Sequence, residues 1–184
     1  MVQNWYNLEY EIILHLLRGK AHVRVMSRDL KIPHSTLLRK LTELNKRLII
    51  DYAIEGKNKV YSLKKILSAQ KIIVNAENYK LIKLISKHPW LSPLFSDILK
   101  ENPSNLIILF GSYAKDTEKK ESDIDLFIET DNLEMKKKIE SIHPKLSVKI
   151  GYFDPEALLI KEIIKNHIIL KGAETYYERT KFFA

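Results

Sequence analysis

Residues 106–125 read LIILFGSYAKDTEKKESDID, and this stretch decides the fold of the C-terminal half of the chain. The apolar run 106–110 is bounded by polar residues and by Gly111-Ser112, which predicts a fully buried strand. A polar loop follows, and ten residues separate Ser112 from Asp123-Ile124-Asp125. The mostly apolar stretch from Ile124 to Ile128 predicts a second strand, and the two aspartates lie at its start.

The chemistry of phosphates and metal ions explains this spacing. A glycine directly after a strand lets the backbone approach a triphosphate, and Ser112 adds a hydroxyl and an N–H. Carboxylates at i and i+2 of a strand point to one face, so Asp123 and Asp125 can hold Mg²⁺ together and act as catalytic residues. We therefore expect Gly111 and Ser112 to bind nucleotide. Lys115 is a further candidate phosphate contact, the alternative being a solvated loop lysine.

The residues after the motif alternate between predicted helices and strands. The predicted elements are a helix from Leu133 to Ser141 capped by Asp131, a strand from Leu146 to Phe153, a helix opened by Asp154-Pro155 that runs to Lys165, and a short strand at 168–170. Upstream, a helix is predicted to end at Lys100. This half is predicted to be α+β.

Gly111-Ser112, ten residues and Asp123-Ile124-Asp125 resemble the motif of the minimal nucleotidyltransferases of the DNA polymerase beta superfamily. The resemblance covers about residues 104–178 and implies a palm-like domain with a small mixed sheet. It implies a nucleoside triphosphate, ATP first of all, bound with Mg²⁺, the glycine and serine holding the triphosphate and the aspartates ligating the metal. Some family members are antitoxins that transfer adenylyl groups to a partner toxin of the HEPN type, and others modify antibiotics or RNA.

Two residues depart from the family pattern. Asp116 stands where many relatives have glycine. Active members carry a third carboxylate on a later strand, and here that strand, KLSVKIGYF, presents Ser147, Lys149 and Gly151 on its polar face. Lys149 aligns with the third carboxylate, would repel a metal and could instead pair with Asp123 or Asp125. Nucleotide binding is therefore better supported than transfer.

The N-terminal third has the order of elements of a winged helix-turn-helix. We predict a helix from Leu8 to Arg18, a short helix at 27–30 with Ser27 as its N-cap, and a longer helix after Pro33. Two strands, 49–54 and 59–63, flank a turn at 55–58. The apolar face of the longer helix consists of Leu37, Leu41, Leu44 and Leu48. The segment resembles winged helix-turn-helix regulators over about residues 7–65.

The outer face of the longer helix is suited to the major groove of double-stranded DNA. It carries hydroxyls and cations, and basic residues flank it and the tip of the hairpin; the predicted DNA-binding residues are Ser35, Thr36, Arg39, Lys40, Thr42, Lys46, Lys57 and Lys59, with Arg47 beside them. Winged helices also serve as protein-interaction and dimerisation modules, and that alternative stays open.

The charge is unevenly distributed along the chain. Residues 1–65 hold 13 Lys and Arg against 6 Asp and Glu, whereas residues 66–184 hold 18 against 17. A polyanionic partner for the first third is one explanation, and a basic soluble surface is the other. The absence of cysteine, of a signal peptide and of any long apolar run favours a cytoplasmic protein without a membrane segment.

These patterns predict an α+β protein in three parts: a winged helix-turn-helix at 1–65, a helical linker at 66–103 and a nucleotidyltransferase-like domain at 104–184. The linker helix, about 64–86, has too many apolar residues for one stripe, which suits a flanking domain or a homodimer contact. Two functional hypotheses follow. One is an enzyme or antitoxin that modifies a partner and regulates its own operon; the other is a transcription regulator whose degenerate domain only binds nucleotide or mediates assembly.

Overall fold

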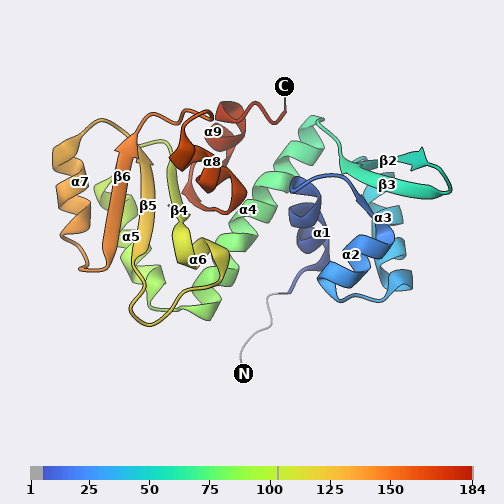
Figure 1. The fold of residues 1–184 in the computed structure, drawn as a ribbon, viewed down its shortest axis with the longest axis horizontal. Coiled ribbons are helices and arrows are strands. Elements are labelled where there is room, and N and C mark those ends of the chain that lie inside the picture. The colour runs from blue at the N-terminus through green and yellow to red at the C-terminus, as the bar shows by residue number, and fades with distance from the viewer. Residues whose placement is uncertain (1–5, 103, 184) are drawn as a thin grey trace. The chain divides into compact units, whose positions relative to one another are not determined.

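The computed structural model describes residues 6–102 and 104–183, which form two compact units divided between Tyr79 and Lys80 (Figure 1). Helix α4 (Leu67–Lys87) crosses this division. Its residues up to Tyr79 belong to the N-terminal unit and those from Lys80 on to the C-terminal unit. The predicted three-part division of the chain stays a prediction.

Three helices and three short strands precede α4 in the N-terminal unit. In chain order they are α1 (Leu8–Leu17), β1 (Ala21–His22), α2 (Val23–Leu30), α3 (His34–Lys46), β2 (Ile50–Glu55) and β3 (Asn58–Leu63). The strands form an antiparallel sheet in the order β1-β3-β2. Leu37, Leu41 and Leu44 of α3 are fully buried, as their helical spacing predicts.

The N-terminal unit corrects three predictions. Helix α2 begins at Val23 rather than at Ser27, and the Ser27 hydroxyl donates to the carbonyl of Ile32 at 2.6 Å instead of capping the helix start. Leu48 is not on the apolar face of α3, because that helix ends at Lys46; Leu48 has a φ of 59° and is 53% exposed. Strand β1 was not predicted, since two residues carry no period.

The C-terminal unit has a four-stranded mixed sheet in the order β6-β5-β4-β7. After α5 (Leu91–Glu101) its elements are β4 (Ile107–Phe110), α6 (Gly111–Lys115), β5 (Ile124–Glu129), α7 (Leu133–Glu140), β6 (Leu146–Gly151), α8 (Leu158–Lys165), β7 (Ile168–Lys171) and α9 (Ala173–Arg179). β5 runs parallel to β6, and β4 runs antiparallel to both β5 and β7. The predicted α+β class with a small mixed sheet is confirmed.

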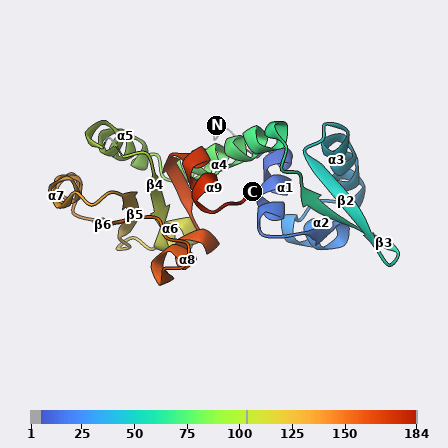
Figure 2. The same ribbon diagram turned by 90° about the horizontal axis from the view of Figure 1, so that it is seen from above.

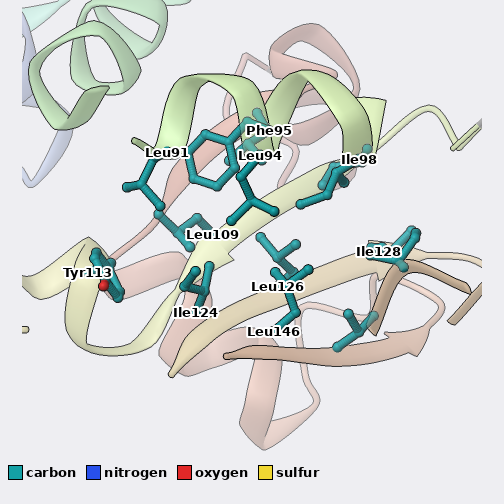
Figure 3. Close-up of a cluster of buried hydrophobic side chains, with 14 of the residues drawn as sticks. Leu91, Leu94, Phe95, Ile98, Leu109, Tyr113, Ile124, Leu126, Ile128 and Leu146 are labelled. Atoms are coloured by element: carbon teal, nitrogen blue, oxygen red, sulfur yellow. The ribbon is translucent and has the colours of Figure 1, made fainter. Parts of the chain in front are cut away.

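The two faces of this sheet differ in what they carry. The first face packs on α5, α7 and the end of α4 through a cluster of buried side chains that includes Leu109, Leu126 and Val148 (Figure 3). Figure 2 shows α8 on the other side of the sheet from α5. On that second face Phe127 packs against Phe153, and Phe153 packs against Tyr176 of α9, with ring centroids 6.0 and 5.6 Å apart. Alternation along β5 therefore places Asp125 with Phe127 on the second face.

Helix starts in the C-terminal unit correct three further predictions. Asn132, not Asp131, caps α7, and its side chain accepts from the N–H of Met135 at 2.9 Å. Helix α8 begins at Leu158, because the Asp154 carboxylate accepts from the N–H of Glu156 at 3.0 Å and closes a separate turn. Helix α6 occupies part of the stretch predicted as a loop.

None of the helices within residues 6–102 and 104–183 combines the length and the apolar character that crossing a membrane requires.

Candidate functional site

The two halves of the Gly-Ser and Asp-x-Asp motif meet through the register of β4 and β5. Phe110, the last residue of β4, is paired with Asp125, so Gly111 lies directly beside the Asp125 carboxylate. Gly111 has a φ of 69°, and a Cβ there would lie 3.0 Å from Cγ of Asp125 and closer still to Oδ2. Both the backbone and the carboxylate therefore require glycine at this position.

Helix α6 begins at Gly111 and carries Ser112 and Tyr113. Ser112 is half-buried, and its carbonyl accepts from the N–H of Thr117 at 3.1 Å. Tyr113 is buried in the first-face cluster. The helix ends at Lys115, and its C-cap residue Asp116 has the left-handed φ of 57°. Glycine adopts this conformation without strain, and aspartate is among the few other residues that tolerate it.

Asp123 and Asp125 differ in their surroundings. Asp123 is exposed just before β5, whereas Asp125 is half-buried within it. Burial raises the pKa of the Asp125 carboxyl; a hydrogen bond from Ser147 and the charge of Lys149 oppose this rise, and the charge of Asp123 adds to it. A cation between the two carboxylates would relieve both the burial penalty and their mutual repulsion.

The register of β5 and β6 refines the prediction about Lys149. Ser147 is paired with Asp125, while Lys149 is paired with Phe127, one step further along the same face. The residue level with Asp125 is therefore a hydroxyl, and the lysine acts on Asp125 through its charge. Among residues 6–102 and 104–183, no group of three or more histidines or carboxylates is placed to hold a metal ion.

Lys115, the predicted phosphate contact, lies at the end of α6. Its Nζ is 3.8 Å from Oε2 of Glu162 on α8, and both side chains are about half exposed. A pair this long and this exposed is weak, so the lysine can exchange Glu162 for another anion at little cost.

A set of contacts that the sequence analysis missed anchors the loop between α6 and β5. Glu118 accepts hydrogen bonds at Oε1 from Lys87 at 2.5 Å and from His88 at 2.8 Å. Lys87 also donates to Asp116 at 2.5 Å. The partners are 29 to 31 residues apart in sequence, so no local spacing indicates them.

The predicted DNA-binding residues of α3 lie mostly on its exposed side. Ser35, Arg39, Thr42 and Lys46 line an open depression together with Leu38 and Glu43, and Thr36 is half-buried. The Thr42 hydroxyl donates to the carbonyl of Leu38 at 2.9 Å, which leaves it free only to accept.

Lys40 and Arg47 differ from this set, because both contact α1. Their side chains meet the same oxygen of Glu9, at 3.2 Å from Lys40 and 2.7 Å from Arg47. The Lys40 and Arg47 side chains of the predicted basic surface are therefore directed toward Glu9 of α1.

The hairpin tip carries the last two predicted DNA contacts. Lys57 and Lys59 are exposed at the turn between β2 and β3. The Lys59 ammonium lies 4.0 Å from the ring centroid of Tyr52, a cation–π contact that restrains the lysine along the hairpin.

The segment that contains the candidate site in the C-terminal unit also matches a known protein family. Residues 95–175 match the family model described as Polymerase beta, Nucleotidyltransferase. The matched segment begins within α5 and contains the whole motif from Gly111 to Asp125. The resemblance to the nucleotidyltransferase superfamily is thus supported for this segment, and the fusion to a winged helix stays a prediction. No curated protein matches the chain.

Proposed function

We propose that the chain binds DNA through its N-terminal unit and that its C-terminal domain transfers a nucleotidyl group from a nucleoside triphosphate, ATP first of all, to a partner protein or another acceptor. The observation that supports transfer most directly is the contact of Gly111 with Asp125, which joins the two halves of a motif inside a segment that matches the nucleotidyltransferase family. An adenylyltransferase antitoxin with a HEPN-type toxin as partner is one form of this proposal.

Each residue of the candidate site would have a separate role in binding the nucleotide and the metal ion. Gly111 lets the Asp125 carboxylate lie against the backbone at the start of α6, and Ser112 beside it would supply a hydroxyl and an N–H to phosphate oxygens. Asp123 and Asp125 fit a divalent cation, since Asp125 is half-buried with a raised pKa and Asp123 is open to solvent. Mg²⁺ bound there would neutralise phosphate charge as the leaving pyrophosphate develops. Lys115 would contact the phosphates by leaving Glu162.

A second candidate function is nucleotide binding without transfer, in a regulator. The positive charge of Lys149 near Asp125 favours it, as does the lack of a third carboxylate among the residues that the structure describes. A metal site with two carboxylates beside a lysine suits one cation held partly by the nucleotide, rather than two held by protein.

The arrangement of the N-terminal unit supports the DNA-binding part of the proposal. Helices α1 to α3 followed by the β2–β3 hairpin, with β1 added to the sheet, have the order of a winged helix-turn-helix. Arg39 and Lys46 are exposed on α3, and most of the excess positive charge of the chain lies in residues 1–65. A homodimer through the helix at 66–86 completes the proposal.

Labelled ATP tests the transfer. The full chain, with any partner that copurifies, is incubated with α-labelled ATP and Mg²⁺, beside Asp125→Asn and a Lys137→Ala control on α7. Label should reach an acceptor with the wild type and the control but not with Asp125→Asn. Binding of ATP without transfer would support the second candidate, and no binding at all would exclude both.

Salt-dependent binding to duplex DNA tests the N-terminal unit. The double variant Arg39→Ala/Lys46→Ala should bind more weakly and should reduce the salt slope by about 2, since each lost phosphate contact removes about 1. Arg28→Ala on α2 removes a similar charge from a residue that the groove face does not include. Equal binding by wild type and double variant would exclude the groove face.

A further inference from the structure

The segment from Asp116 to Asp123 joins the Gly-Ser half of the motif to the Asp-x-Asp half. Most of its residues are exposed, and much of its bonding is local: Lys119 N–H donates to the Ser122 hydroxyl at 2.8 Å, and Ser122 N–H donates to the Lys119 carbonyl at 3.0 Å. The side chain of Lys145 also holds the Lys120 carbonyl. Local bonds of this kind shape a turn but leave its attachment to the domain to other residues.

Glu118 supplies that attachment in the first half of the segment. Its side chain is only 8% exposed, and Oε1 accepts from both Lys87 and His88, at 2.5 and 2.8 Å. Lys87 bonds Asp116 as well, so one ammonium holds two residues at the exit of α6. The hydrogen bond from Lys87 lowers the pKa of Glu118 to about 2, which keeps the carboxylate charged.

His88 ties this cluster to the hydrophobic core. Its ring meets the edge of Tyr113 with centroids 5.6 Å apart, and Tyr113 follows Ser112 directly in α6. The cluster therefore restrains α6 from two sides, at Tyr113 and at Asp116. Lys115 lies between Tyr113 and Asp116 in the chain, and Ser112 directly precedes Tyr113.

The burial of Glu118 is costly for a surface loop. Its second oxygen, Oε2, is buried and has no hydrogen-bond partner among the residues that the structure describes. A carboxylate buried with one unmatched oxygen stabilises a fold less than an apolar side chain of similar size. The buried Glu118 carboxylate is therefore better explained by a role in positioning the loop 116–123 than by a contribution to the stability of the fold.

We propose that Lys87, His88 and Glu118 form a latch, here named the α4 latch, whose residues are positioning residues for nucleotide binding. It holds α6 and the following loop so that Ser112 and Lys115 on one side and Asp123 on the other face the same phosphates. The latch deepens the proposed function and rests on it. Its effect is preorganisation, because an anchored loop loses less conformational freedom when the nucleotide binds.

The test uses the full chain and two measurements. The variants are Lys87→Met, which keeps the length of the stem, Glu118→Gln, the double variant and Lys87→Arg, with Lys100→Met as control, because Lys100 forms an exposed pair with Asp97 on α5. Hydrogen exchange of the amides of 111–123 is measured without nucleotide, and the affinity for ATP·Mg²⁺ is measured by calorimetry.

Lys87→Met and Glu118→Gln should each speed exchange far more in 111–123 than in β4 or β5, and should weaken ATP·Mg²⁺ binding about tenfold. The double variant should bind ATP·Mg²⁺ about as tightly as the weaker-binding single variant, since each single variant already breaks the hydrogen bond between Lys87 and Glu118. Lys87→Arg should restore most of the affinity, and Lys100→Met should match the wild type.

Two results would overturn the latch. One is wild-type affinity in Lys87→Met, and the other is a loss of protection as large in β4 and β5 as in 111–123, which would indicate general destabilisation alone. Failure of the wild type itself to bind ATP·Mg²⁺ would overturn the proposed function and the nucleotide role of the latch together, and is thereby distinguished from failure of the latch alone.

Discussion

The first face of the four-stranded sheet carries only apolar side chains in its core, whereas the second face mixes aromatic rings with charges. Leu126 and Asp125 are neighbours on β5 and point to opposite faces, one fully buried and the other half-buried beside Gly111. On β6, Val148 and Lys149 repeat the division. The comparison teaches that the period of two in a strand can separate stability from chemistry within a few residues.

The largest effect is expected from the first face. Leu126→Ala should lower the free energy of unfolding by about 3 kcal/mol, because the side chain is fully buried and leaves a cavity. Denaturant unfolding of the C-terminal unit measures it. A cost below about 1 kcal/mol would mean that the cluster in Figure 3 is not the main support of the domain.

The second-largest effect is expected for Gly111→Ala, which tests the contact between Gly111 and the Asp125 carboxylate. We expect a cost of about 2 kcal/mol, since a side chain at positive φ is strained and its Cβ overlaps the Asp125 carboxylate. Gly151→Ala is the matched control, because Gly151 also has a positive φ but no atom of the described residues lies within 4 Å of an added Cβ. ATP·Mg²⁺ binding should be lost in the first variant only.

The two carboxylates Glu118 and Asp125 have pKa values shifted in opposite directions, which gives a pH test. The pKa of Glu118 is lowered to about 2 by Lys87, so its contribution to stability is present above the ordinary value of 4.5 and is lost as pH falls toward 2. At neutral pH, Glu118→Gln should lower Tm by about 5 °C, corresponding to about 1 kcal/mol.

That difference in Tm between wild type and Glu118→Gln should shrink between pH 4.5 and 2. Thermal unfolding across this range measures it. A constant difference would show that the carboxylate of Glu118 does not act through its charge.

The smallest effect is expected at Lys149. Lys149→Ala should change the free energy of unfolding by less than about 0.5 kcal/mol, because the side chain is exposed. The positive charge of Lys149 lowers the pKa of Asp125, and the same charge repels a cation bound to Asp125. Removing it should therefore strengthen Mn²⁺ binding about threefold. Lys137→Ala, which removes the same charge from α7, should leave Mn²⁺ binding unchanged, and equal gains in both variants would indicate only a general charge effect.

The sequence predicted long and strongly patterned elements well. The apolar run before Gly111 and the leucines of α3 behave as their periods require. Helix starts were predicted less well, since several polar residues compete for each cap: Asn132 takes the place of Asp131, and Asp154 bonds within its own turn. The two-residue strand β1 has no pattern to detect.

The candidate site was predictable only where it is local in sequence. The motif placed Gly111 near Asp125, and the polar face of the later strand included both Ser147 and Lys149. Which of these two lies level with Asp125 depends on the register of a parallel pair, which no spacing within one strand reveals. The contacts of Glu118 with Lys87 and His88 depend on packing between distant segments, so they required coordinates.

The register that pairs Phe110 with Asp125 also joins the two halves of the motif through a contact that is local in sequence. β4 and β5 form a hairpin, so closing it brings Gly111 against Asp125 through a loop of modest length, which is a fast and local event. Ser147 and Lys149 are connected to the site less locally, because β6 pairs with β5 in parallel and needs the crossover through α7. A chain segment that ends at Glu129 already contains both halves of the motif, whereas the lysine that adjusts their charge lies beyond it, on β6.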